Sequence, residues 1–226
     1  MKNYIRYLLV RVFKTISFYT PLRRYVFYRY PYNFTPTQLI FLCNCLDKTK
    51  ELQESILEIG CDTGNTTVFL NKHMDFSGIE KSYICIDTFS GFTNNDINYE
   101  VNHRGKDKNK LGGFRVNNKK WFDETIRSNE ISRVKSFQAD VNHFDFKEIE
   151  RISFCLIDVD LYIPVKIALE NVYPLIVKGG IIVVDDCKPN QLFDGAYRAY
   201  MEFIEAHQLP EKIILEKLGI IEIEKS

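Results

Sequence analysis

The chain has 226 residues, 45% of them hydrophobic and 27% charged, which suits one ordinary domain with a core and a short extension. Thirty basic and thirty acidic side chains cancel, so the composition argues against a nucleic-acid partner. The six cysteines form no C-x-x-C pair and no zinc spacing, which predicts a reduced, cytoplasmic protein. We find no signal-peptide pattern and no run of roughly 18 apolar residues that could cross a membrane.

The first 30 residues differ from the rest of the chain, because they hold seven basic residues and no acid. Apolar residues at positions 5, 8, 9, 12, 13 and 16 follow helical spacing and leave Arg6 and Lys14 on another face. Such a helix can pack on a partner subunit, cover the cleft of the following domain, or lie on an anionic membrane surface. We favour packing on protein and keep a peripheral contact of residues 1–30 with the inner face of the membrane as the alternative. Residues 1–50 are assigned to a helical extension and residues 51–226 to the main domain.

From residue 55 onward, short β-branched apolar runs alternate with amphipathic stretches, the pattern of βαβ units. The expected strands are 55–60, 83–88, 133–139, 152–159, 180–185, 212–216 and 218–224. The expected helices are 65–74, 118–129, 164–177 and 191–207, and the stretch from Pro174 to Gly180 is predicted to end a helix at a Lys-Gly-Gly turn. The predicted fold class is α/β, a doubly wound, mostly parallel seven-stranded sheet of the Rossmann-like type with an N-terminal helical extension.

The first predicted strand ends in a turn suited to a nucleotide-like ligand. Gly60 and Gly64 let the backbone turn sharply, and the helix that starts near Asn65 presents its positive end. Glu58 precedes this turn, and Asp87 at the tip of the second strand is placed to hold ribose hydroxyls. The glycines do not form G-x-G-x-x-G and no G-K-[ST] is present, so a nicotinamide or flavin dehydrogenase and a P-loop are disfavoured. A βα turn without a nucleotide, with a capping Asp, is the other interpretation.

Residues 92–117 form a polar insert dominated by Asn, Gly, Lys and Asp. Glycines at 105, 112 and 113 offer hinges. An insert of this length inside a compact domain is either a mobile functional loop or a disordered one, and we keep both interpretations.

Acidic residues follow the fourth and fifth predicted strands. Asp158 ends the fourth strand and Asp185 and Asp186 end the fifth, so these three should meet at the carboxyl edge of a parallel sheet, where ligands bind. Carboxylates gathered there repel one another unless a cation holds them, and hard oxygen donors suit Mg²⁺, with Mn²⁺ or Ca²⁺ second. Asp160 has the opposite strand parity and ranks second as a ligand. The alternative is that these acids cap the helices that follow.

The run from 157 to 187, I-D-V-D-L-Y-x-P-x-K-x-A-L-E-x-V-Y-P-L-I-x-K-G-G-I-I-V-V-D-D-C, resembles the macrocin O-methyltransferase family. The core pattern of that family is D-G-D-L-Y, A-L-E-x-L-Y-P, G-G and D-D-Y, and D-T-F-S-G-F at 87–92 is similar to its D-S-F-x-G-L. Its members are metal-dependent enzymes that methylate sugar hydroxyls of macrolide and aminocoumarin antibiotics. The resemblance covers roughly residues 55 to 205. Val159 and Cys187 depart from the family pattern, which leaves the acceptor open because variable loops usually carry acceptor contacts.

The resemblance implies S-adenosylmethionine as the cofactor. The residues it assigns to the methionine and ribose end are Glu58, Gly60, Gly64 and Asn65. It assigns Asp87, with Thr88 beside it, to the ribose hydroxyls, and Asp140 to the adenine side.

The resemblance also implies that Asp158, Asp185 and Asp186 hold the metal, and that Asp158 is the general base. A hydroxyl bound to Mg²⁺ loses its proton more easily, and a sulfonium then delivers its methyl group in line. No covalent nucleophile is required, so Cys61 and Cys187 are interpreted as packing residues. His143 is a second candidate base.

We therefore expect a metal-dependent O-methyltransferase that acts on a hydroxyl of a sugar or glycan, in surface polysaccharide or natural-product glycan synthesis. One alternative is a methyltransferase for a catechol-like or amine small molecule. Another is a non-catalytic nucleotide-binding protein that has kept the fold, although a mere binding module has no reason to gather three acids at one strand edge. A homo-oligomer is left open.

Overall fold

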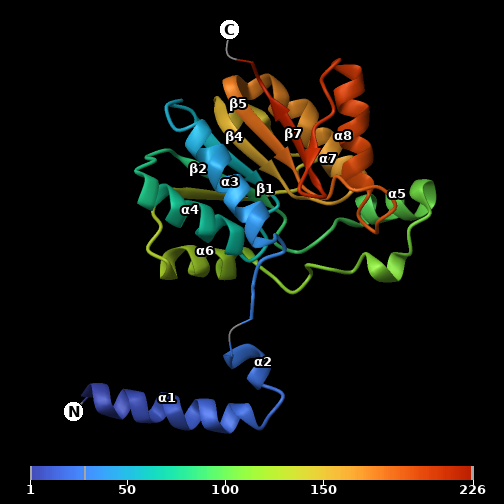
Figure 1. The fold of residues 1–226 in the computed structure, drawn as a ribbon. Helices are drawn as coiled ribbons and strands as arrows, with labels where there is room; N and C mark the ends of the chain where they lie inside the picture. The colour runs from blue at the N-terminus through green and yellow to red at the C-terminus, as the bar shows by residue number, and fades with distance from the viewer. Residues whose placement is uncertain (1, 28, 225–226) are drawn as a thin grey trace. The chain divides into compact units, whose positions relative to one another are not determined.

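The chain divides into two compact units in the computed structural model, which describes residues 2–27 and 29–224. The first unit ends at Asn33 and contains α1 (Lys2–Phe18) and α2 (Arg23–Val26). The second unit starts at Phe34 and contains a sheet with helices on both sides (Figure 1). No helix in these described ranges is long and apolar enough to cross a membrane.

The division between the units falls earlier than the sequence boundary at residue 50. Helix α3 (Pro36–Lys48) belongs to the second unit, because its side chains Leu39, Leu42 and Leu46 are buried there. Its start is sharply defined: the Thr35 side chain accepts a hydrogen bond from the Gln38 N–H, and the Gln38 side chain accepts one from the Thr35 N–H. The extension is therefore shorter than predicted.

One seven-stranded sheet forms the centre of the second unit, with the strand order β3-β2-β1-β4-β5-β7-β6. The strands are β1 (Ser55–Ile59), β2 (Tyr83–Asp87), β3 (Val134–Gln138), β4 (Ile152–Ile157), β5 (Ile176–Val184), β6 (Ile213–Ile214) and β7 (Leu218–Glu222). Strands β1 to β5 pair in parallel, and β7 runs antiparallel to both β5 and β6. This topology confirms the predicted doubly wound, mostly parallel sheet.

Helices cover both faces of the sheet, with α3, α4 and α6 on one side and α7 and α8 on the other (Figure 1). Their bounds are α4 (Asn65–Ser77), α5 (Asn94–Arg104), α6 (Lys119–Ser128), α7 (Tyr162–Val172) and α8 (Gly195–Ala206), with 3-10 turns η1 (Lys108–Lys110), η2 (Phe146–Glu148) and η3 (Tyr173–Leu175). The largest core cluster joins β1, β4 and β5 to α7 and α8 through side chains such as Leu57, Cys155, Leu169 and Tyr200. Every residue of β4 is buried, as expected for a central parallel strand.

The predicted helix end between Pro174 and Gly180 is wrong. The helix α7 passes into η3, and β5 then begins at Ile176 and runs through the Lys-Gly-Gly stretch. The pairing of β5 with β4 slips there, since Ile152 faces Ile176 whereas Phe154 faces Ile181. Gly180 allows this irregularity, because a Cβ atom at that position would lie 2.8 Å from Ile176 and from the Val177 carbonyl oxygen.

The polar insert 92–117 is ordered in its first half, where sequence reasoning expected a loop. Thr93 caps α5 by accepting a hydrogen bond from the Asp96 N–H, and Gly105 ends this helix with a positive φ of 67°. Leu111, after η1, is fully buried with Ile97 of α5. The insert thus packs in a small apolar cluster that also contains Leu161, just before α7.

Candidate active site

The turn after β1 is the first part of the site. Gly60 has a φ of 86°, and a Cβ atom there would lie 1.9 Å from the backbone oxygen of Asp158. Gly64 has the same φ and is followed by the first residue of α4, Asn65. Only glycine tolerates such backbone angles and such a close approach. The turn predicted to bind the cofactor therefore lies directly against the end of β4, where the predicted metal ligands begin.

Glu58 lies in β1, two residues before Gly60, and is 1% exposed. Its Oε2 atom accepts hydrogen bonds from the Thr67 hydroxyl at 2.7 Å and from the Tyr83 hydroxyl at 2.8 Å. Burial raises the pKa of Glu58 to about 7, although these hydrogen bonds work in the opposite direction. Through these hydrogen bonds Glu58, which lies in β1, links this strand to α4 and β2. Its contact with the cofactor stays a prediction.

Asp87 holds the other side of the turn. Its Oδ2 atom accepts hydrogen bonds from the N–H groups of Cys61 and Asp62, both at 2.8 Å, and its Oδ1 atom accepts one from the Phe89 N–H at 2.6 Å. The neighbouring Thr88 hydroxyl donates to the Gly91 carbonyl oxygen at 2.7 Å. Asp87 therefore stabilises the turn by capping backbone groups, and its predicted ribose contact would be an additional role.

Asp140 continues the same edge of the sheet beyond β3. The Ala139 N–H donates to the Asp87 carbonyl oxygen at 2.9 Å, which aligns the ends of β2 and β3. The Asp140 carboxylate accepts a hydrogen bond from the Asn142 N–H and lies 2.9 Å from Nδ1 of His143. The predicted cofactor residues thus lie at the carboxyl ends of β1, β2 and β3. His143 is 76% exposed and lies beyond β3, whereas the acid cluster lies at β4 and β5, so the structure disfavours His143 as the base.

The predicted metal ligands follow the neighbouring strands β4 and β5. Ile157 pairs with Val184, so Asp158 and Asp185 follow directly at adjacent strand ends. Burial, followed by the negative charges of Asp185 and Asp186, raises the pKa of Asp158 well above its ordinary value. Burial also raises the pKa of Asp185 to about 6. Asp158 and Asp185 therefore follow adjacent strand ends, and the neighbouring acids disfavour the charged form of Asp158.

Lys217 is the charged group that sequence reasoning missed. Its Nζ atom lies 2.7 Å from Oδ2 of Asp185 and 3.1 Å from Oδ1 of Asp186. Lys217 directly precedes β7. The Cys187 N–H donates a hydrogen bond of 2.8 Å to the Lys217 carbonyl oxygen, which holds this segment beside the end of β5. Nothing local in the sequence signals this pairing, because only the antiparallel return of β7 brings Lys217 to the end of β5.

The acid cluster, Asp158, Asp185 and Asp186, does not have a hydrogen-bond partner for every buried carboxylate oxygen. The Oδ1 atom of Asp185 is buried and accepts no hydrogen bond. Asp160 is also buried, and its pKa is raised well above the ordinary value by burial and by the charge of Asp158. Across the described residues, no group of three or more His, Cys, Asp or Glu side chains has the arrangement of a metal site. Metal binding by Asp158, Asp185 and Asp186 accordingly stays a prediction.

The returning half of the insert contacts the glycine turn. The Asn117 side-chain amide donates to Oδ1 of Asp62 at 3.2 Å. A Cβ atom on Gly91 would lie 2.8 Å from the Gly113 carbonyl oxygen, so the returning half of the insert passes closely over the end of β2. The returning half of the insert therefore contacts the turn at Asp62.

Two further residues that the sequence analysis did not single out link the insert to the segments around α7 and α8. Glu100 is 1% exposed and accepts a hydrogen bond from the Tyr162 N–H at 2.8 Å. Arg104 pairs with Glu100 at 2.8 Å and with Asp194 at 2.5 Å. The spacing of Glu100 and Arg104 by four residues after a Thr93 cap was the signal that this segment is helical.

The two cysteines near the site are buried. Burial raises the pKa of both Cys61 and Cys187 well above the ordinary thiol value, so neither thiol readily forms the nucleophilic thiolate. Their position supports the interpretation of both as packing residues.

Glu58 gives the site a testable pH dependence. Because its pKa is raised from 4.5 to about 7, the folded protein keeps a proton that the unfolded chain releases. Stability should therefore fall as the pH rises through this window, by about 3 kcal/mol in all. We expect Glu58→Gln to remove this slope from urea unfolding curves recorded between pH 4.5 and 8. Glu80→Gln on the exposed surface is the matched control, and an unchanged slope in Glu58→Gln would refute the assignment.

A glycine turn at the carboxyl edge of a doubly wound sheet, with acids at the neighbouring strand ends, is the ligand-binding arrangement of a Rossmann-like fold. With the family match that follows, it identifies an S-adenosylmethionine-dependent methyltransferase. The particular family follows from the sequence model of the macrocin-O-methyltransferase (TylF) family, which matches residues 39–219. The chain belongs to this family, and the resemblance seen in its motifs is confirmed.

Solved structures show the same fold at low sequence identity. The O-methyltransferase NovP is 15% identical, with a TM-score of 0.70 over 83% of this chain and 80% of NovP. The calicheamicin methyltransferase CalS11 is 18% identical, with a TM-score of 0.68 over 94% of this chain and 90% of CalS11. An apo structure of CalS11, described as a TDP-rhamnose 3'-O-methyltransferase, is 17% identical, with a TM-score of 0.56 over 82% of this chain and 78% of that one. The comparison with curated proteins gave no match.

Proposed function

We propose that this methyltransferase transfers its methyl group to a hydroxyl of a sugar or glycan, in surface polysaccharide or natural-product glycan synthesis, with the help of a divalent cation. Membership of the macrocin-O-methyltransferase family supports an oxygen acceptor. CalS11, which shares the fold, is described as a TDP-rhamnose 3'-O-methyltransferase, and this supports a sugar. Six free, buried cysteines are compatible with the reducing cytoplasm as the place of action.

The observation that carries this proposal is the contact between the glycine turn and the acid cluster. Gly60 lies against the backbone of Asp158, so a ligand on the turn and a hydroxyl at the acids would be neighbours. Methyl transfer requires the donor carbon and the acceptor oxygen in contact and in line, and most of the rate gain comes from that orientation. A nucleotide-binding protein without catalysis needs the turn but not the acids.

Each part of the site then has a role in the transfer. S-adenosylmethionine supplies a methyl group carried on a cationic sulfonium. The turn from Gly60 to Gly64 binds its amino-acid end with the N–H groups at the start of α4, and Asp87 and Asp140 bind the nucleoside. Asp158 would remove the hydroxyl proton, because it lies at the end of β4 directly beside the turn.

The donor set suits a hard divalent cation, although Lys217 now lies beside two of the acids. Asp158, Asp185 and Asp186 would hold Mg²⁺ or a related ion, and the unpartnered Oδ1 atom of Asp185 is available as a ligand. A bound cation would lower the pKa of the acceptor hydroxyl and so assist its deprotonation. Lys217 compensates only part of the charge of the cluster, which leaves it attractive to a cation.

This arrangement predicts that Lys217 competes with the metal. We expect Lys217→Met to strengthen Mg²⁺ binding roughly tenfold, because the variant loses a positive charge beside Asp185 and Asp186. The measurement is a Mg²⁺ titration followed by melting temperature and by calorimetry. Lys212→Met, which breaks a surface pair with Glu222, is the matched control. If neither Mg²⁺, Mn²⁺ nor Ca²⁺ binds the wild type or Lys217→Met, the metal proposal is wrong.

The function itself is tested in two stages. S-adenosylmethionine and S-adenosylhomocysteine should each raise the melting temperature of the protein, and a lack of any shift would contradict cofactor binding. Nucleotide-linked and lipid-linked sugars are then screened with labelled cofactor, with and without a chelator. A catechol and a small amine panel form the competing arms. Transfer of label only to one of those panels would overturn the sugar proposal in favour of the corresponding small-molecule methyltransferase.

The oligomeric state stays a prediction. Light scattering of the full chain at several concentrations would establish whether a homo-oligomer forms.

A further inference from the structure

The N-terminal unit, residues 2–33, has almost no core of its own. Among the side chains of residues 5–24, 26, 27 and 29–33, only Ser17 is buried. Large apolar side chains of α1 remain uncovered, with Leu9 65%, Phe13 57% and Ile16 62% exposed. Ordering a helix costs conformational entropy that apolar burial normally offsets, so this unit must find its apolar contacts on another surface.

The exposed apolar residues form a continuous stripe along α1. At 3.6 residues per turn, Ile5, Leu8, Leu9, Val12, Phe13 and Ile16 fall on one face of the helix. Arg6 and Arg11 fall on opposite sides of this stripe. An apolar face flanked by arginines suits the boundary between lipid headgroups and acyl chains, where long basic side chains extend to the phosphates while their stems remain in contact with apolar surface.

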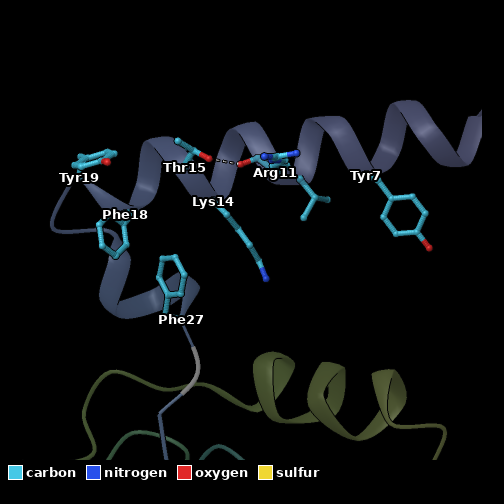
Figure 2. A pocket seen from close by; sticks show the side chains of 8 residues that line it. Tyr7, Arg11, Lys14, Thr15, Phe18, Tyr19 and Phe27 are labelled. Carbon is cyan, nitrogen blue, oxygen red and sulfur yellow. Dashed lines mark hydrogen bonds between the residues drawn. The ribbon is translucent and has the colours of Figure 1, made fainter.

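A second feature lies on the other face of α1, toward α2. Arg11 and Lys14 line a hollow of about 510 Å³ together with Tyr7 and Phe18 of α1 and with Phe27, which follows α2 (Figure 2). Phe18 and Phe27 close one end of it with an edge-on contact at 5.9 Å between ring centroids. This hollow lies opposite the apolar stripe, so we assign the membrane contact to the stripe and not to the hollow.

The charge of the unit suits an anionic surface. Residues 1–30 contain seven Lys and Arg residues and no Asp or Glu. An anionic bilayer offers mobile negative charge along the whole length of the helix. The 17 residues of α1 would span about 25 Å, less than the roughly 30 Å of a bilayer core, so the helix suits a position on the surface.

We propose that residues 2–33 dock this enzyme on an anionic lipid surface. The apolar stripe of α1 enters the boundary between headgroups and acyl chains, and Arg6 and Arg11 at its two edges bind lipid phosphates. This inference does not rest on the proposed function, since it concerns a unit that shares no residue with the candidate active site. It has a functional consequence, because an enzyme held at a bilayer has ready access to acceptors that carry a lipid.

The test is flotation of the full chain with vesicles. We expect co-flotation with vesicles of phosphatidylcholine that contain about one third phosphatidylglycerol, little with pure phosphatidylcholine, and partial release in high salt. The double variant Leu9→Asp/Phe13→Asp should abolish flotation. Arg6→Gln/Arg11→Gln should weaken it by roughly tenfold, which corresponds to the loss of two phosphate contacts.

Matched controls lie on the second unit. Phe76→Asp changes a side chain that is 92% exposed on α4, and Arg127→Gln/Arg198→Gln removes two exposed cations. Both should float like the wild type. All variants should keep the melting-temperature shift with S-adenosylhomocysteine, which separates a failed membrane contact from a failed cofactor site.

Three results would overturn the proposal. Absence of flotation with anionic vesicles would do so directly. Equal flotation of the wild type and Leu9→Asp/Phe13→Asp would mean that another part of the chain binds lipid. Loss of a dimer in Leu9→Asp/Phe13→Asp, seen by light scattering without any vesicle binding by the wild type, would assign the stripe to a second copy of the chain.

Discussion

Asp158→Asn is expected to lower turnover by roughly 10² to 10⁴-fold while the protein stays folded and binds its cofactor. The substitution keeps the shape of the side chain but removes the proton acceptor and one of the three proposed metal ligands. The folded state should not suffer, because the raised pKa means that the charge of Asp158 is unfavourable in its surroundings. Turnover is measured with the acceptor found in the sugar screen, and cofactor binding by the melting-temperature shift with S-adenosylhomocysteine.

The control for Asp158→Asn is Asp145→Asn. Asp145 is exposed and caps η2 by accepting a hydrogen bond from the Lys147 N–H, a role that asparagine performs equally well. This control should keep both turnover and stability. Turnover of Asp158→Asn within about threefold of the wild type would exclude Asp158 as the base, whatever the metal does.

Gly60→Ala is expected to have the second large effect, through the backbone. The new Cβ atom would lie 1.9 Å from the Asp158 carbonyl oxygen, and alanine would also have to adopt a φ of 86°. The turn or the end of β4 must then move, which we expect to cost about 3 kcal/mol or more and to lower the melting temperature by roughly 6 to 12 °C. Cofactor binding should be lost with it, because the turn and the acid cluster share this contact.

Gly78→Ala separates the cost of the positive φ from the cost of the close approach to Asp158. Gly78 ends α4 with a φ of 64°, but a Cβ atom there meets nothing within 4 Å. The control therefore measures the cost of the left-handed conformation alone, about 1 kcal/mol, and should keep cofactor binding. If Gly60→Ala and Gly78→Ala lost the same stability and both bound S-adenosylhomocysteine, the close approach to Asp158 would have no functional importance.

The parts of the site that the sequence predicted are those in which the chemistry lies next to a strand end. Gly60 and Asp87 follow strands marked by short apolar runs, and parallel strands end on the same edge of the sheet. The same rule brought Asp158 and Asp185 together, and the pairing of Ile157 with Val184 supports it. Periodicity and topology were sufficient here because the contacts follow from regular structure.

Other features depend on contacts between segments far apart in the chain. The Lys-Gly-Gly stretch looked like a helix end, yet β5 runs through it because Gly180 fits against Ile176 and Val177. Glu100 appeared to belong to a polar loop, but burial against the Tyr162 N–H places it in an ordered helix. Local pattern cannot show which polar residue is buried by a distant partner.

By itself, the sequence determined the sheet and the family, and it placed the glycine turn and the three acids at strand ends, because strands and motifs are marked by short local patterns. Only the tertiary structure decided that Glu58 is buried under the turn, that the insert lies over it, and that Lys217 pairs with Asp185 and Asp186. The physical reason is that burial and charge pairing depend on which segments the folded chain brings together. Lys217 is 31 residues away from Asp186 in the chain, and the antiparallel return of β7 places the two side by side.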